Sequence, residues 1–151
     1  MDATFSDLVE RFRRLGCHDP EGWARSEIQE GIPQLARFVF LRQLWALVVP
    51  RNDRRALNRF AGPNDDGRGG ALRRLKDAGA SPDDLLIVVR EAQSEVVRQA
   101  AYLLDQCDEP GQDFVDVKWA LYELDSSFDP MRPIGGLHES VDDPDFREQG
   151  S

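Results

Sequence analysis

The strongest hydrophobic pattern in the chain is the apolar run IPQLARFVFLRQLWALVVP at residues 32–50. Pro33 is compatible with a first helical turn, where its missing N–H makes no hydrogen bond, whereas Pro50 cannot continue a helix. The run therefore predicts a helix over residues 33–49, about 25 Å long at about 1.5 Å per residue. It is shorter than the roughly 20 apolar residues of a membrane span, and Arg37 and Arg42 interrupt it. No membrane insertion is predicted.

This predicted helix is apolar on both halves. One half is predicted to face the core and carries Leu35, Ala36, Val39, Phe40, Leu44, Ala46 and Leu47. The other half carries a second stripe, formed by Phe38, Leu41, Trp45 and Val48. Helices that are apolar all round are usually buried, so we expect the second stripe to be buried as well. The alternative is an exposed apolar interface, because aromatic residues beside arginines are typical of binding hot spots.

A second long helix is predicted over residues 82–106. Its start is marked by SPDD at residues 81–84, where Ser81 can cap and Pro82 can take the first helical position. We expect it to pack through the apolar positions that recur every three or four residues, namely Leu85, Val89, Ala92, Val96, Leu103 and Cys107. Helical spacing also predicts shorter helices from Phe5 to Gly16, from Asp19 to Glu30, over residues 53–60 and over residues 71–78.

The pattern changes after Gly111. Val115, Val117, Trp119 and Leu121 alternate with polar residues, which predicts a strand, and RPIGGLHESV is expected to be the returning strand. A helix over residues 113–125 stays open, because that segment also carries an apolar stripe at helical spacing. The fold class predicted is mainly α: a compact bundle of about five to six helices around helices 33–49 and 82–106, with a small β-hairpin at about 114–140. Residues 1–140 form one domain, and residues 141–151 an acidic, flexible tail.

Charge is distributed unevenly along the 151 residues, whose net charge is −9. Residues 1–80 carry 14 Lys and Arg against 11 Asp and Glu, a net charge of +3, and residues 81–151 carry 5 against 17, a net charge of −12. The opening MDATFSDLVERF lacks the pattern of a signal peptide, and two cysteines are too few for a disulfide framework. We therefore expect a cytoplasmic protein, and such charge asymmetry favours charged partners.

Candidate chemistry is sparse. Cys17-His18 has the residue types of a nucleophile–base pair, but the sequence shows no third residue that would orient the histidine. We therefore do not predict a catalytic pair. Glu27 and Glu30 share a helical face, where we favour a solvated pair over a metal site. His138, expected at the end of the returning strand, has no cysteine or histidine cluster beside it. The loop GRGG at residues 67–70 lacks the ending of a phosphate-binding P-loop. No catalytic residue, metal or cofactor is predicted.

The leading functional hypothesis is a non-enzymatic domain that binds another protein. Its acidity suggests a basic partner, as for bacterial antitoxins and immunity proteins that mask basic enzymes. The contact candidates are Asp108, Glu109, Asp113, Asp116, Glu123, Asp125 and Asp129. One alternative is a homo-oligomer that packs through Phe38, Leu41, Trp45 and Val48. Another is a metal-dependent hydrolase that uses Glu27, Glu30 and His138. Nucleic-acid binding is not predicted, since the arginines of residues 51–76 lack interleaved aromatic residues.

Overall fold

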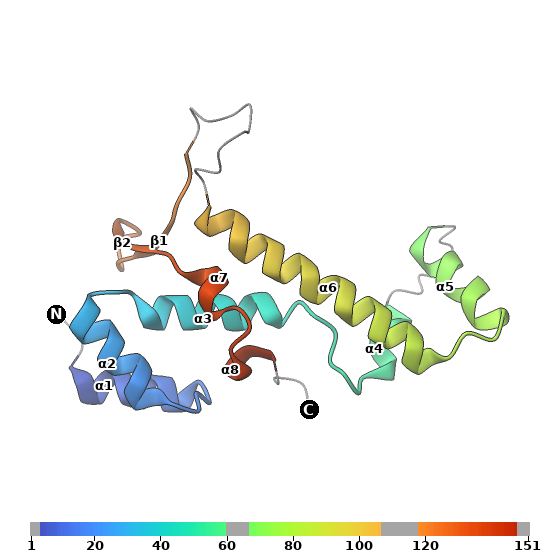
Figure 1. Cartoon of the computed structure of the whole chain (residues 1–151), viewed down its shortest axis with the longest axis horizontal. Coiled ribbons are helices and arrows are strands. Elements are labelled where there is room, and N and C mark those ends of the chain that lie inside the picture. Colours follow the sequence, from blue (N-terminus) through green and yellow to red (C-terminus); the bar gives the residue numbers. More distant parts are fainter. Residues whose placement is uncertain (1–3, 60–66, 107–117, 148–151) are drawn as a thin grey trace.

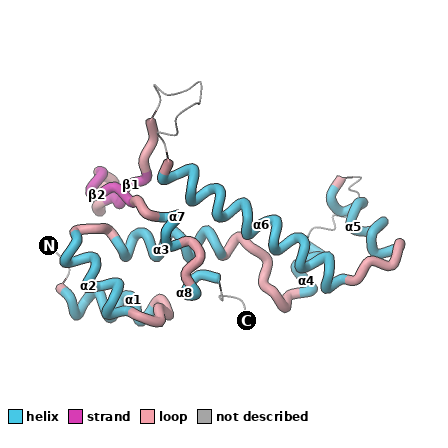
Figure 2. Tube along the Cα trace, viewed as in Figure 1, coloured by secondary structure: helices cyan, strands magenta, loops and turns pink. Residues whose placement is uncertain are grey.

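The chain is mainly helical, with a small antiparallel hairpin, which confirms the predicted fold class (Figures 1 and 2). The structure is a computed structural model that describes residues 4–59, 67–106 and 118–147. Within these residues the elements are α1 (Phe5–Arg14), α2 (Pro20–Glu30), α3 (Gln34–Trp45), α4 (Arg54–Arg59), α5 (Arg68–Asp77), α6 (Pro82–Asp105), β1 (Leu121–Leu124), β2 (Pro130–Ile134), α7 (Leu137–Ser140) and α8 (Pro144–Arg147). In this described part, no helix is long and apolar enough to cross a membrane.

The helices begin where the sequence provides caps. The Thr4 side chain accepts a hydrogen bond from the Asp7 backbone N–H, and the Asp7 side chain accepts one from the Thr4 backbone in return, which forms a capping box. Asp19 caps α2, which ends at Gly31 in the left-handed conformation. Ser81 caps α6. Local capping chemistry therefore places three of the helix starts where they were predicted.

α3 is shorter than predicted, because it ends at Trp45 rather than at residue 49. The backbone of Val49 bonds to α6 instead of continuing the helix: its N–H donates to Gln93 Oε1 over 2.9 Å, and its carbonyl accepts from Arg90. These two side chains satisfy polar backbone groups that a longer α3 would have satisfied itself.

The aromatic stripe of α3 is the buried one. Phe38, Leu41, Trp45 and Val48 lie in the main core, as the favoured interpretation predicted, and so they offer no exposed interface. Trp45 also donates its indole N–H to the carbonyl of Val141 over 2.7 Å. The half that was predicted to be core is less buried: Phe40 and Leu44 are half-buried, and Leu47 is 72% exposed beyond the helix end. Because both halves of this helix are apolar, the spacing of its apolar residues does not predict which half is more deeply buried.

Two separate apolar clusters lie along α6. The larger one joins α1, α2, α3, α7 and α8 to the C-terminal half of α6, where Val97 and Ala101 contribute. The smaller one contains Val49, Ala56, Leu57, Leu72 and Leu86, and joins α4 and α5 to the N-terminal half. Figure 1 shows α6 running between these two ends of the molecule. α6 is thus the element that connects them.

The hairpin is smaller than predicted. β1 and β2 pair antiparallel, with Leu121 opposite Ile134 and Leu124 opposite Pro130. The returning strand ends at Ile134, because Gly136 adopts the left-handed conformation and begins α7, so LHES is helical rather than extended. A helix through residues 121–124 is excluded by β1, and residues 113–117 lie outside the described part.

The predicted flexible tail is folded as far as residue 147. Val141 and Phe146 are buried in the main core, and α8 packs against α3 (Figure 1). Phe146 enters an aromatic cluster, with its ring centroid 4.9 Å from that of Phe38 and 6.1 Å from that of Trp23. The acidic composition of this segment had indicated a flexible tail, although Phe146 belongs to the core. Residues 148–151 lie outside the described part.

Candidate functional site

The face of α6 that was predicted to pack does so only in its N-terminal part: Leu85 and Val89 are half-buried against the smaller cluster, whereas Ala92, Val96 and Leu103 are exposed. Cys107 lies outside the described residues. The buried side chains of α6 are Leu86, Arg90, Ser94, Val97 and Ala101, whereas Val88, Ala92, Val96 and Leu103 are exposed. The prediction was wrong for Ala92, Val96 and Leu103, because the inner face of α6 includes polar residues with buried partners, such as Arg90 on the carbonyl of Val49. Val96 is 67% exposed and the adjacent Val97 only 4%, so the two faces are sharply distinguished.

The exposed face has the spacing of a helix-binding seam. We call Ala92, Val96, Gln99 and Leu103 the α6 seam; successive members are separated by four, three and four residues, as in a heptad repeat. Val88, 66% exposed, lies beside it. Exposed acidic side chains, Glu91 and Glu95, flank the seam. A contiguous exposed apolar surface with a charged border marks an interaction site more often than an isolated exposed residue does.

The predicted acidic contact residues are not gathered into one described surface. Asp108, Glu109, Asp113 and Asp116 lie outside the described residues. Glu123, Asp125 and Asp129 lie on the hairpin.

Two of these hairpin acids have structural roles. Glu123 pairs with Arg132 over 2.8 Å, and Asp125 Oδ1 accepts the backbone N–H groups of Ser127 and Asp129 over 2.7 and 3.0 Å. Glu123 and Asp125 therefore help to hold the hairpin and its turn.

The hairpin tip also exposes apolar side chains. Phe128 is 82% exposed and has a positive φ of 66°, which non-glycine residues seldom adopt. Tyr122, Leu124 and Met131 are exposed as well. The hairpin therefore carries a second apolar surface, on a different element from the α6 seam.

Glu27 and Glu30 do not form a shared site. Glu27 is buried: its Oε1 pairs with Arg132 over 2.8 Å, and its Oε2 accepts the backbone N–H of Leu35 over 2.8 Å. Glu30 instead accepts from Ser26. The expected solvated pair was therefore wrong for Glu27, because Arg132 reaches it from β2, 105 residues along the chain.

The predicted metal-site residue His138 has another partner. It lies on α7, not at a strand end, and its Nδ1 contacts Asp105 Oδ2 over 2.7 Å. Among the residues that the structure describes, no three His, Cys, Asp or Glu side chains are grouped to hold a metal ion.

Cys17 and His18 share a partner that sequence analysis missed. Asp145 of α8 is buried, and its carboxylate accepts from Cys17 Sγ over 3.2 Å and from the His18 backbone N–H over 2.9 Å, and contacts His18 Nδ1. The histidine is thus paired with the carboxylate rather than with the thiol. Burial, together with the nearby Asp145 carboxylate, raises the pKa of the Cys17 thiol to about 12. A thiol held in its protonated form is a poor nucleophile.

We expect Cys17 to resist alkylation in the folded protein. In a Cys107→Ser background at pH 8.5, a pKa of about 12 leaves less than about one thiolate in a thousand, against a substantial fraction for an unperturbed thiol. Iodoacetamide labelling followed by mass spectrometry should be at least about 100-fold slower in buffer than in denaturant. Labelling at equal rates would show that the thiol is neither buried nor bound to Asp145.

The GRGG segment begins a helix. Gly67 precedes α5, and residues 68–70 form its first turn, with Gly69 and Gly70 buried.

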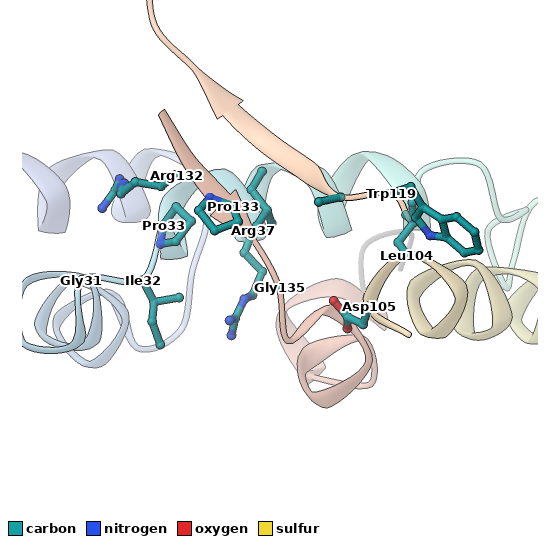
Figure 3. A pocket seen from close by; sticks show the side chains of 12 residues that line it. Gly31, Ile32, Pro33, Arg37, Leu104, Asp105, Trp119, Arg132, Pro133 and Gly135 are labelled. Atoms are coloured by element: carbon teal, nitrogen blue, oxygen red, sulfur yellow. The ribbon is translucent and has the colours of Figure 1, made fainter. Parts of the chain in front are cut away.

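A candidate ligand site is a cavity beside the base of the hairpin (Figure 3). Its volume is about 520 Å³, and it is lined by residues from α3, the end of α6 and both flanks of the hairpin. Arg37 reaches it from α3, and Asp105 from the end of α6. Arg37 is 8% exposed; burial lowers the pKa of its guanidinium, against the opposing charges of Glu139, Asp105 and Glu30.

Gly136 makes room for the Arg37 guanidinium. A Cβ at residue 136 would lie 2.6 Å from Arg37 Nη2 and 3.0 Å from Cζ, and the residue has a φ of +67°. A Cβ at the adjacent Gly135 would meet no atom within 4 Å. Residue 136 therefore has to be glycine for two reasons: its backbone is left-handed, and the Arg37 guanidinium occupies the space that a Cβ would need.

We expect Gly136→Ala to destabilise the fold by about 1–2 kcal/mol, because it combines a left-handed alanine with a clash against a buried side chain. Gly135→Ala is the matched control and should change stability by less than about 0.5 kcal/mol. Urea denaturation of both variants measures the difference. Equal stabilities would contradict the placement of Arg37 against Gly136.

Comparison of the chain with protein-family models, with characterised proteins and with solved structures found no match.

Proposed function

We propose that this chain is a protein-binding domain whose α6 seam docks an amphipathic helix of a basic partner. The observation that carries the proposal is the exposure of Val96 and Leu103, 67% and 55%, on a helix whose opposite face lies in the core. An amphipathic partner helix recognises such a surface through apolar residues at three- and four-residue spacing.

The physical reason is the cost of leaving this face in water. Covering apolar surface contributes about 25 cal/mol for each Å² removed from water, and the seam runs from Ala92 to Leu103 on a 24-residue helix. A bound helix covers it over the same length, with knobs-into-holes packing favoured by the heptad-like spacing.

The charge around the seam supports a basic partner rather than a second copy of the chain. Glu91 and Glu95 flank the seam, and residues 81–151 carry a net charge of −12. Two copies packed through the same face would bring these like charges together, whereas a helix with Lys or Arg at its flanks would neutralise them. An immunity or antitoxin protein that masks a basic enzyme is the specific form of this proposal.

A designed peptide tests the seam directly. A fluorescein-labelled amphipathic helix, with leucine at heptad positions and lysine at the flanks, is titrated with the protein and followed by anisotropy. We expect saturable binding that Val96→Asp weakens at least about 10-fold, because it places a carboxylate in the apolar contact. Leu47→Asp, at a residue that is 72% exposed on another element, should leave binding unchanged.

Equal binding to the wild type and Val96→Asp, or equal binding of a peptide with glutamate flanks, would overturn the proposal. Sedimentation equilibrium provides the second readout. A dimer of the protein alone that Val96→Asp dissociates would assign the seam to a second copy, and would likewise overturn the proposed basic partner.

A further inference from the structure

The cavity beside the hairpin contains two buried groups of opposite charge that each retain an unused hydrogen-bonding atom. Arg37 Nε and Asp105 Oδ1 have no hydrogen-bond partner within the described part of the chain. Arg37 makes one long bond, from Nη1 to Ser140 Oγ over 3.4 Å, and Asp105 uses Oδ2 for the backbone N–H and Nδ1 of His138. Buried polar atoms are nearly always paired, so each such atom calls for an explanation.

The two groups are near each other without forming an ion pair. No pair within 4 Å joins Arg37 to any described carboxylate, although the charge of Asp105 is among those that act on it. Gly136 fixes one side of the guanidinium, because it packs against Nη2 and Cζ. α7 fixes Asp105 by donating to Oδ2. The donor and the acceptor are therefore held in place independently of each other.

The rest of the cavity wall is mostly apolar, apart from Arg132, whose guanidinium pairs with Glu27 and Glu123. Ile32, Leu104, Trp119 and Pro133 contribute to it, and Figure 3 shows Trp119 and Leu104 on the side of Asp105. A volume of about 520 Å³ lies in the range of small-molecule sites, which combine apolar walls with a few placed polar groups.

We propose that this cavity binds a small zwitterion with an apolar body, of the class of aromatic and branched α-amino acids. The ligand carboxylate accepts from Arg37, its ammonium group donates to Asp105 Oδ1, and its side chain lies against Trp119 and Leu104. Arg37 supplies the charge-assisted donor that a carboxylate prefers, and Asp105 supplies the matching acceptor. The site is separate from the α6 seam and does not depend on it.

Binding can be read at Trp119, whose indole N–H donates to the carbonyl of Leu103 over 2.9 Å. The ¹H–¹⁵N spectrum of the full chain is titrated with L-phenylalanine and with L-leucine, and the Trp119 indole signal is assigned with Trp119→Phe. We expect a saturable shift of that signal. Two analogues that each lack one charged group, 3-phenylpropionate and 2-phenylethylamine, should bind at least about 10-fold more weakly than L-phenylalanine.

Substitutions distinguish a loss of ligand binding from a loss of folding. Arg37→Gln and Asp105→Asn should each weaken L-phenylalanine at least about 10-fold, while Arg98→Gln, which removes an arginine outside this cavity, should not. Gly135→Leu fills the cavity at a position where an added Cβ meets no atom, so it tests the site even where Arg37→Gln fails to fold. It should abolish the shift.

Three results would overturn the proposal: no shift at Trp119 with either amino acid at millimolar concentration, equal affinity for L-phenylalanine and both analogues, or undiminished binding to Gly135→Leu. Because none of these involves the peptide of the preceding test, failure of this site and failure of the α6 seam are distinguishable.

Discussion

Phe146→Ala is expected to lower the free energy of unfolding by about 3–5 kcal/mol, the usual cost of removing a fully buried aromatic side chain. Phe146 is 1% exposed and packs against Phe38 and Trp23. Its loss leaves a cavity where three helices meet. For a chain of this length the change corresponds to a melting temperature roughly 10 °C lower. Differential scanning calorimetry measures it.

Phe128→Ala is the matched control. Phe128 is 82% exposed at the hairpin tip, and alanine inherits the same positive φ, so we expect a change within about 0.5 kcal/mol. If Phe146→Ala is as stable as Phe128→Ala, the C-terminal segment does not pack on α3, and the burial of Asp145 against Cys17 fails with it.

Arg132→Gln is expected to lower the free energy of unfolding by about 2–3 kcal/mol. Removing one partner of a buried ion pair leaves the other charge without compensation, which costs about 3–5 kcal/mol when both partners are fully buried. Here Glu27 is buried but the Arg132 side chain is 34% exposed, so we take a smaller value. Arg132 also pairs with Glu123, and its loss therefore loosens the contact between β2 and α2.

Glu27→Gln/Arg132→Gln is the informative control. Without the buried charge, the double variant should recover at least about 1 kcal/mol relative to Arg132→Gln alone. Urea denaturation of the single and double variants completes the cycle. Additive losses in the double variant would contradict a direct pair between the two residues.

The sequence predicted the elements of the fold better than their packing. Caps and prolines act within one turn, so Asp19 and Ser81 marked helix starts that the structure confirms. For α3 the burial of the stripe with Phe38 and Trp45 was predicted, but not that this stripe packs deeper than the other half. For α6 the predicted packing face was wrong at Ala92, Val96 and Leu103. Nothing in the spacing of α6 distinguishes Val96, which is exposed, from Val97, which is buried.

The candidate sites depended on contacts that no local pattern reveals. Arg132 reaches Glu27 from 105 residues away, and Asp145 reaches Cys17 from 128 residues away. Both partners lie in the C-terminal part, one of them in a segment whose composition indicated a tail. In the sequence, Arg37 stands out only as a charged residue within an apolar helix. Its role in the cavity depends on Gly136, and two adjacent glycines carry no specific signal of such a contact.

The exposure of the α6 seam is the claim on which the proposed function depends, and adjacent cysteine substitutions test it. Val96→Cys and Val97→Cys are compared in a Cys107→Ser background, in which the remaining thiol, Cys17, is buried. We expect maleimide to label Val96→Cys at nearly the rate of the unfolded chain, and Val97→Cys at least about 100-fold more slowly, since 67% and 4% of the native side chains are exposed. If the thiol of Val96→Cys is protected as strongly as that of Val97→Cys, the seam is already covered in the isolated protein and cannot be the docking surface.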